Sequence, residues 1–163
     1  MNKSNGGRMK TKQYRTSRCI LKSDNEFLLV VHNNYHGVNN GIWGLPGGRI
    51  DRGERPVQTA RRELYEELTV DLGELHEVGD WSYKGYSHKV FGTIFDGKIG
   101  RVDDYEILEV DWFTLEDVKS LADEDRLHTG FELASIERFN GLLNKLSLSG
   151  SSGRRKKGGR RSR

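Results

Sequence analysis

An abrupt change in composition at Pro56 constrains the fold of this chain more than any other feature. The segment that leads to it, IWGLPGGRIDRGERP, is rich in glycine and holds both prolines of the chain, which favours an irregular loop. The segment that begins there, PVQTARRELYEEL, is typical of an amphipathic helix, because proline suits the first helical position and apolar residues recur on one face: Val57, Ala60, Leu64 and Leu68. The sequence therefore predicts a helix over residues 56–68 that follows a glycine-rich loop.

The opposite face of this helix carries three glutamates, Glu63, Glu66 and Glu67, at spacings that bring side chains together on a helix surface. Like charges at these spacings repel by roughly a few tenths of a kcal/mol per pair. An acidic helix face is most often a solvated surface. Clustered carboxylates also suit hard, oxygen-seeking ions such as Mg²⁺ or Mn²⁺. The helix alone leaves both interpretations open.

The loop and the helix together form a longer pattern. Gly48 is followed by five residues, then Glu54, then seven residues and the run RELYEELTV. This pattern resembles the Nudix box of the MutT-like Nudix hydrolases, and the residues that match are Gly48, Glu54, Arg62, Glu63, Leu64, Glu66, Glu67 and Val70. Thr69 stands where the family usually has glycine, which predicts a change in how the helix ends. LPGG before the box and a strand ending in Trp-Phe after it also match, so the resemblance covers residues 14–146.

The resemblance implies a fold and a reaction. The expected fold is α+β, or a three-layer α/β/α sandwich, in which helices flank a mixed central sheet. The expected reaction is attack of water on a pyrophosphate linkage in a nucleoside diphosphate joined to another group, with Mg²⁺ or Mn²⁺ as cofactor. The alternative of a non-catalytic binding module that kept the fold is disfavoured by the intact glutamates of the box.

The resemblance also implies roles for the charged residues of the box. Glu66 and Glu67 are expected to be direct metal ligands, while Glu63 is either a further ligand or the base that deprotonates water. Arg62 is expected to pair with Glu54 or with a box carboxylate and thereby to orient the site. The expected catalytic residues are therefore Glu63, Glu66 and Arg62.

Two further metal ligands are expected outside the helix. The carbonyl oxygen of Gly47, just before the box, is the candidate backbone ligand. A further carboxylate is expected from the acidic segment VDDYE, which precedes a strand. Glu106 is the first choice in that segment, with Asp103 and Asp104 as alternatives.

The substrate is less constrained than the reaction. The segment WGLPGG is similar to the loop of MutT-like (deoxy)nucleoside triphosphate pyrophosphatases, so a (deoxy)nucleoside triphosphate or an oxidised nucleotide is the first expectation. Hydrolysis of ADP-ribose or a nucleotide sugar, of a dinucleoside polyphosphate, or of an RNA 5′ end are the alternatives. Tryptophans are more often core residues than platforms for a base, but candidate substrate-binding residues outside the box are His32, Asn33, Trp43, Trp81 and Tyr83.

The rest of the chain predicts strands and two more helices. Strand patterns lie on both sides of a turn at residues 23–25, on both sides of Gly85, and in ILEVDWF, with shorter pieces at 42–45 and 49–50. A helix begins after Thr114, which with Asp117 three residues later forms a capping pattern. The last helix is expected over residues 131–146. Cys19 lies in a predicted strand, where a buried hydrophobic role is expected, and a single cysteine excludes an internal disulfide.

The basic residues of the chain are concentrated at its two ends. Residues 1–18 hold six of the 27 Lys and Arg and residues 150–163 hold seven, with no acidic residue in either segment. We therefore predict a basic flexible N-terminus (1–13), a Nudix hydrolase domain (14–148) and a disordered basic tail (149–163). The tail either binds nucleic acid or another polyanion, or serves as a solubilising terminus.

The composition also bears on where the protein acts. No apolar run approaches the roughly 20 residues that a membrane helix needs, and the basic N-terminus lacks the apolar stretch of a secretory signal. The sequence thus predicts a cytoplasmic protein with a small nucleotide substrate, as a monomer or a homodimer.

Overall fold

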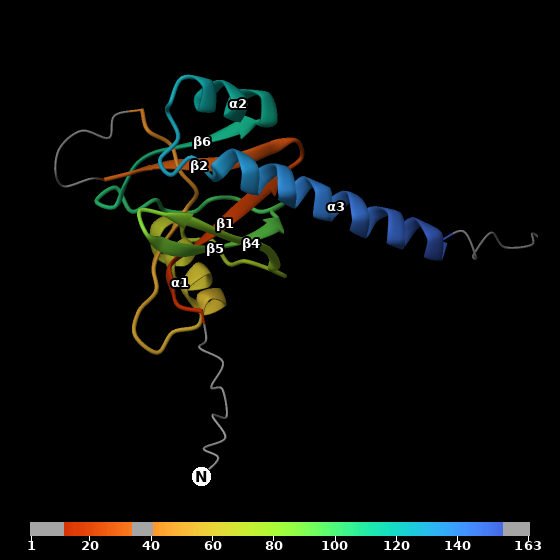
Figure 1. The fold of residues 1–163 in the computed structure, drawn as a ribbon, viewed down its shortest axis with the longest axis horizontal. Coiled ribbons are helices and arrows are strands. Elements are labelled where there is room, and N and C mark those ends of the chain that lie inside the picture. The colour runs from red at the N-terminus through yellow and green to blue at the C-terminus, as the bar shows by residue number, and fades with distance from the viewer. Residues whose placement is uncertain (1–11, 34–40, 155–163) are drawn as a thin grey trace, which may run out of the picture.

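The computed structural model describes residues 12–33 and 41–154, with side chains up to Leu148. Within these ranges, six strands form one sheet (Figure 1): β1 (Tyr14–Ser23), β2 (Glu26–His32), β3 (Gly47–Arg49), β4 (His76–Tyr83), β5 (Tyr86–Ile94) and β6 (Ile107–Thr114). The order is β4-β5-β1-β2-β6, and β3 also pairs with β1. β1 and β5 run parallel while the other pairs run antiparallel, so the sheet is mixed.

Three helices of the described residues complete the fold: α1 (Pro56–Leu68), α2 (Leu115–Asp123) and α3 (Glu132–Arg154). The mixed sheet with its helices confirms the predicted α+β architecture, and α1 has the bounds that its sequence pattern predicts. The predicted cap of α2 is also present, since Thr114 Oγ1 accepts from the Asp117 amide and the Asp117 carboxylate accepts from the Thr114 amide. Among the described residues, no helix is long and apolar enough to cross a membrane.

Two tight turns set the register of the hairpins. The β1–β2 turn places Asp24 at φ 52°, and the β4–β5 turn places Lys84 and Gly85 at φ 50° and 79°. In the β4–β5 turn, the two consecutive positive φ angles are typical of a type I′ turn, whose twist matches that of antiparallel strands. The turns predicted at residues 23–25 and near Gly85 are therefore confirmed.

The two faces of the sheet bury separate apolar clusters, because successive strand residues point to opposite faces. The first cluster joins α1 to the sheet through Ala60, Leu64, Leu68, Cys19, Leu21, Leu28 and Val30. The second joins α2 and α3 to the other face through Val118, Leu121, Ile136, Phe139, Ile20, Phe27, Leu29 and Val31. Cys19 is fully buried, as predicted, and its burial raises the pKa of its thiol to about 12. α1 therefore stands on its own side of the sheet.

Two segments differ from the sequence prediction. α3 continues to Arg154, past its predicted end at Leu146 and into the predicted tail, and its C-terminal half projects beyond the sheet (Figure 1). Residues 42–45 form isolated bridges, Val30–Gly44 and Trp43–Leu127, in place of a strand. The predicted flexible N-terminus up to residue 11 and the tail from 155 to 163 lie outside the described residues.

Candidate functional site

The loop between β3 and α1 brings the backbone of Gly48 against the carboxylate of Glu63. Pairing of β3 with β1, Gly48 opposite Ser17, fixes this backbone before the chain turns into the helix. A Cβ atom at residue 48 would lie 2.5 Å from Cδ of Glu63 and 2.7 Å from each of its carboxylate oxygens. Any side chain larger than hydrogen would displace that carboxylate. The glycine of the box and the first glutamate of the helix therefore form one unit.

Arg62 joins the loop to the acidic face of α1. Its guanidinium makes a fork to Glu54, with Nε–Oε2 at 2.7 Å and Nη2–Oε1 at 3.0 Å, and its Nη1 donates to Glu63 at 3.0 Å and to Glu66 at 3.1 Å. The pairing expected for Arg62 is present with both partners. The guanidinium holds the pKa of the Glu54 carboxyl down to about 2, and these carboxylates raise the pKa of Arg62 further above its ordinary value.

Glu54 fastens the loop to the first turn of the helix. Beyond its ion pair, its Oε1 accepts from Thr59 Oγ1 at 2.6 Å and from the Asp51 amide at 3.2 Å. Helix α1 thus begins without a conventional side-chain cap, since Arg55 at the N-cap position contributes its own amide to Gln58. The charged network supplies the rigidity that a Ser or Thr cap would otherwise give.

Glu63 and Glu67 both have raised pKa values. Burial raises the pKa of Glu63 to about 7, with the neighbouring Glu67 carboxylate as the second cause. Burial also raises the pKa of Glu67 to about 7, although the cationic Arg18 acts in the opposite direction. Two desolvated carboxyls side by side resist full ionisation, which is the electrostatic condition that a bound cation relieves.

Five carboxylates face one open cavity of about 400 Å³: Glu63, Glu66, Glu67, Asp103 and Glu106. The first three come from α1 and the last two from the segment before β6. Glu106, the predicted further carboxylate, therefore lies at the same cavity as the box glutamates, together with its alternative Asp103. Asp104 lies instead at an adjoining pocket of about 230 Å³, with Glu66 and Thr69.

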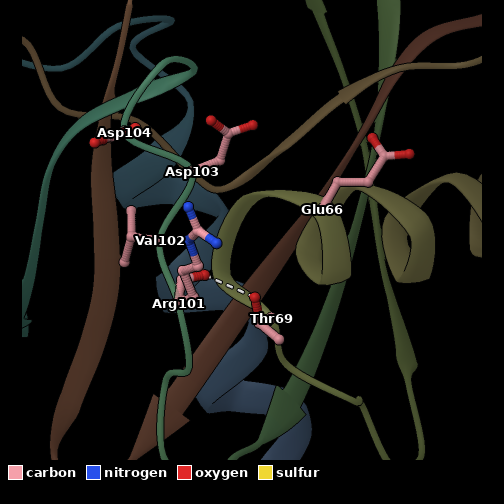
Figure 2. A pocket seen from close by; sticks show the side chains of 6 residues that line it. All are labelled: Glu66, Thr69, Arg101, Val102, Asp103 and Asp104. Carbon is pink, nitrogen blue, oxygen red and sulfur yellow. Dashed lines mark hydrogen bonds between the residues drawn. The ribbon is translucent and has the colours of Figure 1, made fainter.

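Residues 100–106, the acidic loop, are tied to the C-terminal end of α1 (Figure 2). The Gly100 amide donates to Leu68 O at 3.0 Å, and the Asp103 amide donates to Glu67 O at 2.9 Å. Between them, Thr69 Oγ1 donates to Arg101 O at 2.7 Å. The helix ends on Thr69 in the left-handed region, at φ 51° and ψ 49°. That conformation costs a residue with a Cβ about 1–2 kcal/mol. The helix therefore ends in the conformation that glycine would give, and threonine adds the side-chain contact with Arg101.

Gly47 and Arg18 occupy the floor of the site. Gly47 has φ 138°, and a Cβ there would lie 2.2 Å from Ser17 O, so only glycine fits. Its amide donates to Glu67 Oε2 at 3.3 Å. Its carbonyl oxygen, the predicted metal ligand, accepts from Arg18 Nη1 at 3.1 Å.

Arg18 was not predicted as a site residue. Its side chain is half-buried, burial lowers its pKa, and the nearby carboxylate of Glu67 is the largest opposing effect. The signal was available in β1, where a charged residue stands between the buried Ser17 and Cys19. Its closeness to Glu67 could not be read from the chain, because it arises only when α1 docks on β1.

His32 reaches the same carboxylates from the end of β2. Its Nε2 atom is buried, has no hydrogen-bond partner among the described residues, and lies 3.5 Å from Glu67 Oε1. Burial lowers the pKa of His32 to about 4, with Arg18 as the second cause, so the ring is neutral at physiological pH. The contact with Glu67 is therefore not an ion pair, and His32 offers an unused polar atom at the site.

The other predicted substrate residues are placed differently. Trp43 is buried in the core with its ring edge-to-face against Phe113, 4.7 Å between centroids, and a role for it in substrate binding stays a prediction. The Asn33 side-chain amide donates to Tyr105 O at 2.8 Å, so Asn33 anchors the acidic loop. Trp81 and Tyr83 are partly buried against the α2 and α3 side of the sheet, away from the α1 cluster.

The carboxylate set suits a hard divalent cation, since it offers several oxygen donors around one cavity and two carboxyls with raised pKa values. In the arrangement described for residues 12–33 and 41–154, no three His, Cys, Asp or Glu side chains converge closely enough to hold an ion. Arg62 explains part of this, because it engages Glu63 and Glu66 at 3.0 and 3.1 Å. A cation would compete with this guanidinium for both carboxylates.

Comparison with known proteins points to one family. The model of the NUDIX domain matches residues 12–131. An RNA pyrophosphohydrolase of Bartonella clarridgeiae is 31% identical over 112 residues, which covers 53% of this chain and 65% of the relative. Another, of Azorhizobium caulinodans, is 36% identical over 78 residues, covering 37% and 46%. The chain thus spans between about half and two thirds of the length of these curated relatives.

Solved structures show the same fold. The NUDIX domain of Shewanella oneidensis NrtR, complexed with ADP ribose, has a TM-score of 0.65 at 23% identity and covers 82% of this chain and 90% of that one. The MutT protein from Methanosarcina mazei Go1 has a TM-score of 0.61 at 24% identity and covers 79% and 94%. At this level of identity the likeness concerns the fold alone.

Proposed function

Because this chain belongs to the NUDIX domain family, we propose that it is a divalent-metal-dependent pyrophosphohydrolase whose substrate is the phosphorylated 5′ end of an RNA. One observation carries the reaction: carboxylates from α1 and from the acidic loop face a single cavity of about 400 Å³. This collection of oxygen donors, beside the half-buried cationic side chain of Arg18, is suited to a metal-bound diphosphate.

Glu66 and Glu67 would hold the cation, with Asp103 and Glu106 across the cavity and Glu63 beside them. When bound, such an ion supplies charge neutralisation of the phosphate oxygens and acidification of a water molecule. The raised pKa of Glu67 fits this role, because a carboxyl that is costly to ionise alone is stabilised as a carboxylate beside a cation.

The remaining charged residues position these ligands. Arg62 fixes Glu63 and Glu66 relative to the loop by binding Glu54 through its other nitrogens. Glu63 has a pKa of about 7, so its carboxyl is able to take up and release a proton near neutral pH. The two roles of Glu63, ligand and base, are distinguished by kinetics: loss of a base lowers kcat without weakening metal binding.

The choice of RNA reverses the order of substrates that the LPGG loop suggested. The curated relatives named here are RNA pyrophosphohydrolases, whereas the likeness to MutT structures, at 24% identity or less, supports the fold only. The aromatic residue of the WGLPGG segment, Trp43, is also buried in the core and so does not favour a pocket for a single oxidised base. We therefore place RNA ends before free nucleoside triphosphates.

A direct comparison of substrates tests the proposal. The full chain is incubated with Mg²⁺ or Mn²⁺ and a 5′-triphosphorylated RNA oligonucleotide, a nucleoside triphosphate, an oxidised nucleotide or ADP-ribose, and products are resolved by mass. We expect the RNA to be converted fastest, with its 5′ phosphate chain shortened, and no conversion in excess chelator. Faster conversion of free nucleotides than of RNA would overturn the substrate class while leaving the reaction class standing.

The reaction class has its own test. Glu66→Gln removes one charge from the cavity, and its matched control, Glu137→Gln, removes one from an exposed position of α3. We expect the first to lose about 100-fold or more in kcat and the second to match the wild type, since substitution of a metal-holding carboxylate removes interactions made in the transition state. Wild-type turnover by Glu66→Gln would rule out the proposed site.

A further inference from the structure

We infer that Thr69 is a positioning residue: its hydroxyl fixes the acidic loop against the end of α1 and so sets where Asp103 and Glu106 stand opposite the glutamates of the helix. The metal-binding consequence rests on the proposed function. The positioning itself does not, because it is a property of the metal-free chain. Thr69 is also the one position of the box where this sequence departs from the family pattern.

The Thr69 hydroxyl makes the central one of three hydrogen bonds that attach the acidic loop to the end of α1. The outer two bonds, Gly100 N to Leu68 O and Asp103 N to Glu67 O, are between backbone atoms and do not depend on the side chain at residue 69. The central bond, Thr69 Oγ1 to Arg101 O at 2.7 Å, does depend on it. Figure 2 shows this bond between the end of the helix and the loop that carries Asp103.

The backbone conformation of residue 69 gives a second, independent reason to assign a role to the threonine hydroxyl. At φ 51° and ψ 49° glycine would be free of strain, whereas threonine, branched at Cβ, is among the residues least suited to this region. The local backbone therefore does not explain threonine here, and the bond to Arg101 does. Gly100 completes the contact, because a Cβ there would lie 2.9 Å from Cβ of Thr69 and 3.0 Å from its carbonyl oxygen.

Backbone hydrogen bonds couple the position of Glu106 to that of Asp103. The Asp103 carbonyl accepts from the Glu106 amide at 3.2 Å and from the Ile107 amide at 2.9 Å. The far end of the loop is held by Asn33, whose backbone amide donates to Glu106 O at 2.8 Å. Asn33 thus holds one end of the acidic loop and Thr69 the other. At the end nearest the helix glutamates, the side chain that holds the loop is the hydroxyl of Thr69.

Three variants separate the hydroxyl from the backbone. Thr69→Ser keeps the hydroxyl, Thr69→Ala removes it but keeps a Cβ in the left-handed region, and Thr69→Gly removes both hydroxyl and strain. The first measurement is amide hydrogen exchange of residues 100–103 in the full, metal-free chain. We expect wild-type exchange in Thr69→Ser, and faster exchange in Thr69→Ala and Thr69→Gly.

The second measurement is Mn²⁺ affinity by calorimetry, without substrate. We expect Thr69→Ser to bind like the wild type, and Thr69→Ala and Thr69→Gly to bind about 10-fold more weakly, as when a group that orients metal ligands is removed. Thr69→Gly serves as the control for general destabilisation, because relief of strain should keep its melting temperature at or above that of Thr69→Ala while the loop still loosens.

The outcomes distinguish this inference from the proposed function. Equal exchange of residues 100–103 in Thr69→Ala and Thr69→Ser would overturn the inference, whatever the enzyme hydrolyses. A wild-type chain that binds no Mn²⁺ would overturn the proposed function, and the exchange comparison would still decide the role of Thr69. Faster exchange in Thr69→Ala with unchanged Mn²⁺ affinity would overturn the link from loop position to metal binding.

Discussion

The carboxylate of Glu63 rests on the bare backbone of Gly48: a Cβ at residue 48 would lie 2.5 Å from Cδ of Glu63. Two residues that are fifteen positions apart in sequence are thus a single structural unit. The glycine is required for space, since its φ is not in the left-handed region. This relationship makes the glycine of the box as sensitive to substitution as the glutamate itself.

Gly48→Ala should therefore damage activity more than folding. The added methyl group pushes the Glu63 carboxylate out of place, and a displacement of about 1 Å at a catalytic group can cost on the order of 100-fold in rate. The measurement is kcat beside the melting temperature. Gly73→Ala is the matched control, because a Cβ there meets nothing within 4 Å and the residue needs no positive φ. Equal activity of the two variants would contradict the packing argument.

The fork between Arg62 and Glu54 should contribute measurable coupling. Arg62→Lys keeps the charge but cannot donate through two nitrogens at once, while Glu54→Gln keeps the shape and removes the charge. Because both side chains are mostly buried, 27% and 16% exposed, we expect a coupling free energy of about 1–3 kcal/mol from a double-mutant cycle in urea. Additive effects of the two substitutions would show that the fork does not stabilise the fold.

Glu54 should also make stability depend on acid pH. Its pKa falls from an ordinary 4.5 to about 2 in the folded chain, so the unfolded chain binds more protons between those values. The stabilisation is therefore fully present above about pH 4.5 and is lost as the pH falls toward 2.

Discounted for its solvent contact, the loss attributable to Glu54 is about 1–2 kcal/mol. Urea unfolding of the wild type and of Glu54→Gln, followed from pH 5 to pH 2.5, measures it. The two curves should converge as the pH falls. A constant difference between them over this interval would show that Arg62 does not lower the pKa of Glu54.

Local signals made α1 predictable from sequence. Proline at its first position and four apolar residues on one face mark its start and its packing side without any knowledge of the rest of the chain, and the cap at Thr114 marks α2 in the same way. The end of α3 was not predictable on the same grounds, because apolar periodicity stops near Leu146 whereas the helical backbone runs on to Arg154.

The types of residue that form the site were predictable from the sequence, but their arrangement was not. The glutamates of α1 follow from spacing, and the acidic composition of VDDYE pointed to the further carboxylates. Which residue of the VDDYE segment faces the cavity depends on backbone hydrogen bonds from the acidic loop to Glu67 and Leu68. No sequence pattern encodes these hydrogen bonds. Arg18 and the burial of Trp43 depend likewise on packing between elements far apart in the chain.

The basic tail should act on RNA and not on small substrates. Residues 155–163 hold six Lys and Arg, and each phosphate contact with a single strand adds about 0.7 to the slope of log affinity against log salt. Deleting these residues should weaken RNA binding, reduce that slope by as much as about 4, and leave any hydrolysis of free nucleotides unchanged. Fluorescence anisotropy of a labelled RNA between low and moderate salt measures the slope, and a chain with the six residues replaced by Gln controls for length. An unchanged slope would mean that the tail does not hold the RNA, and that the groups which do must lie within residues 1–154.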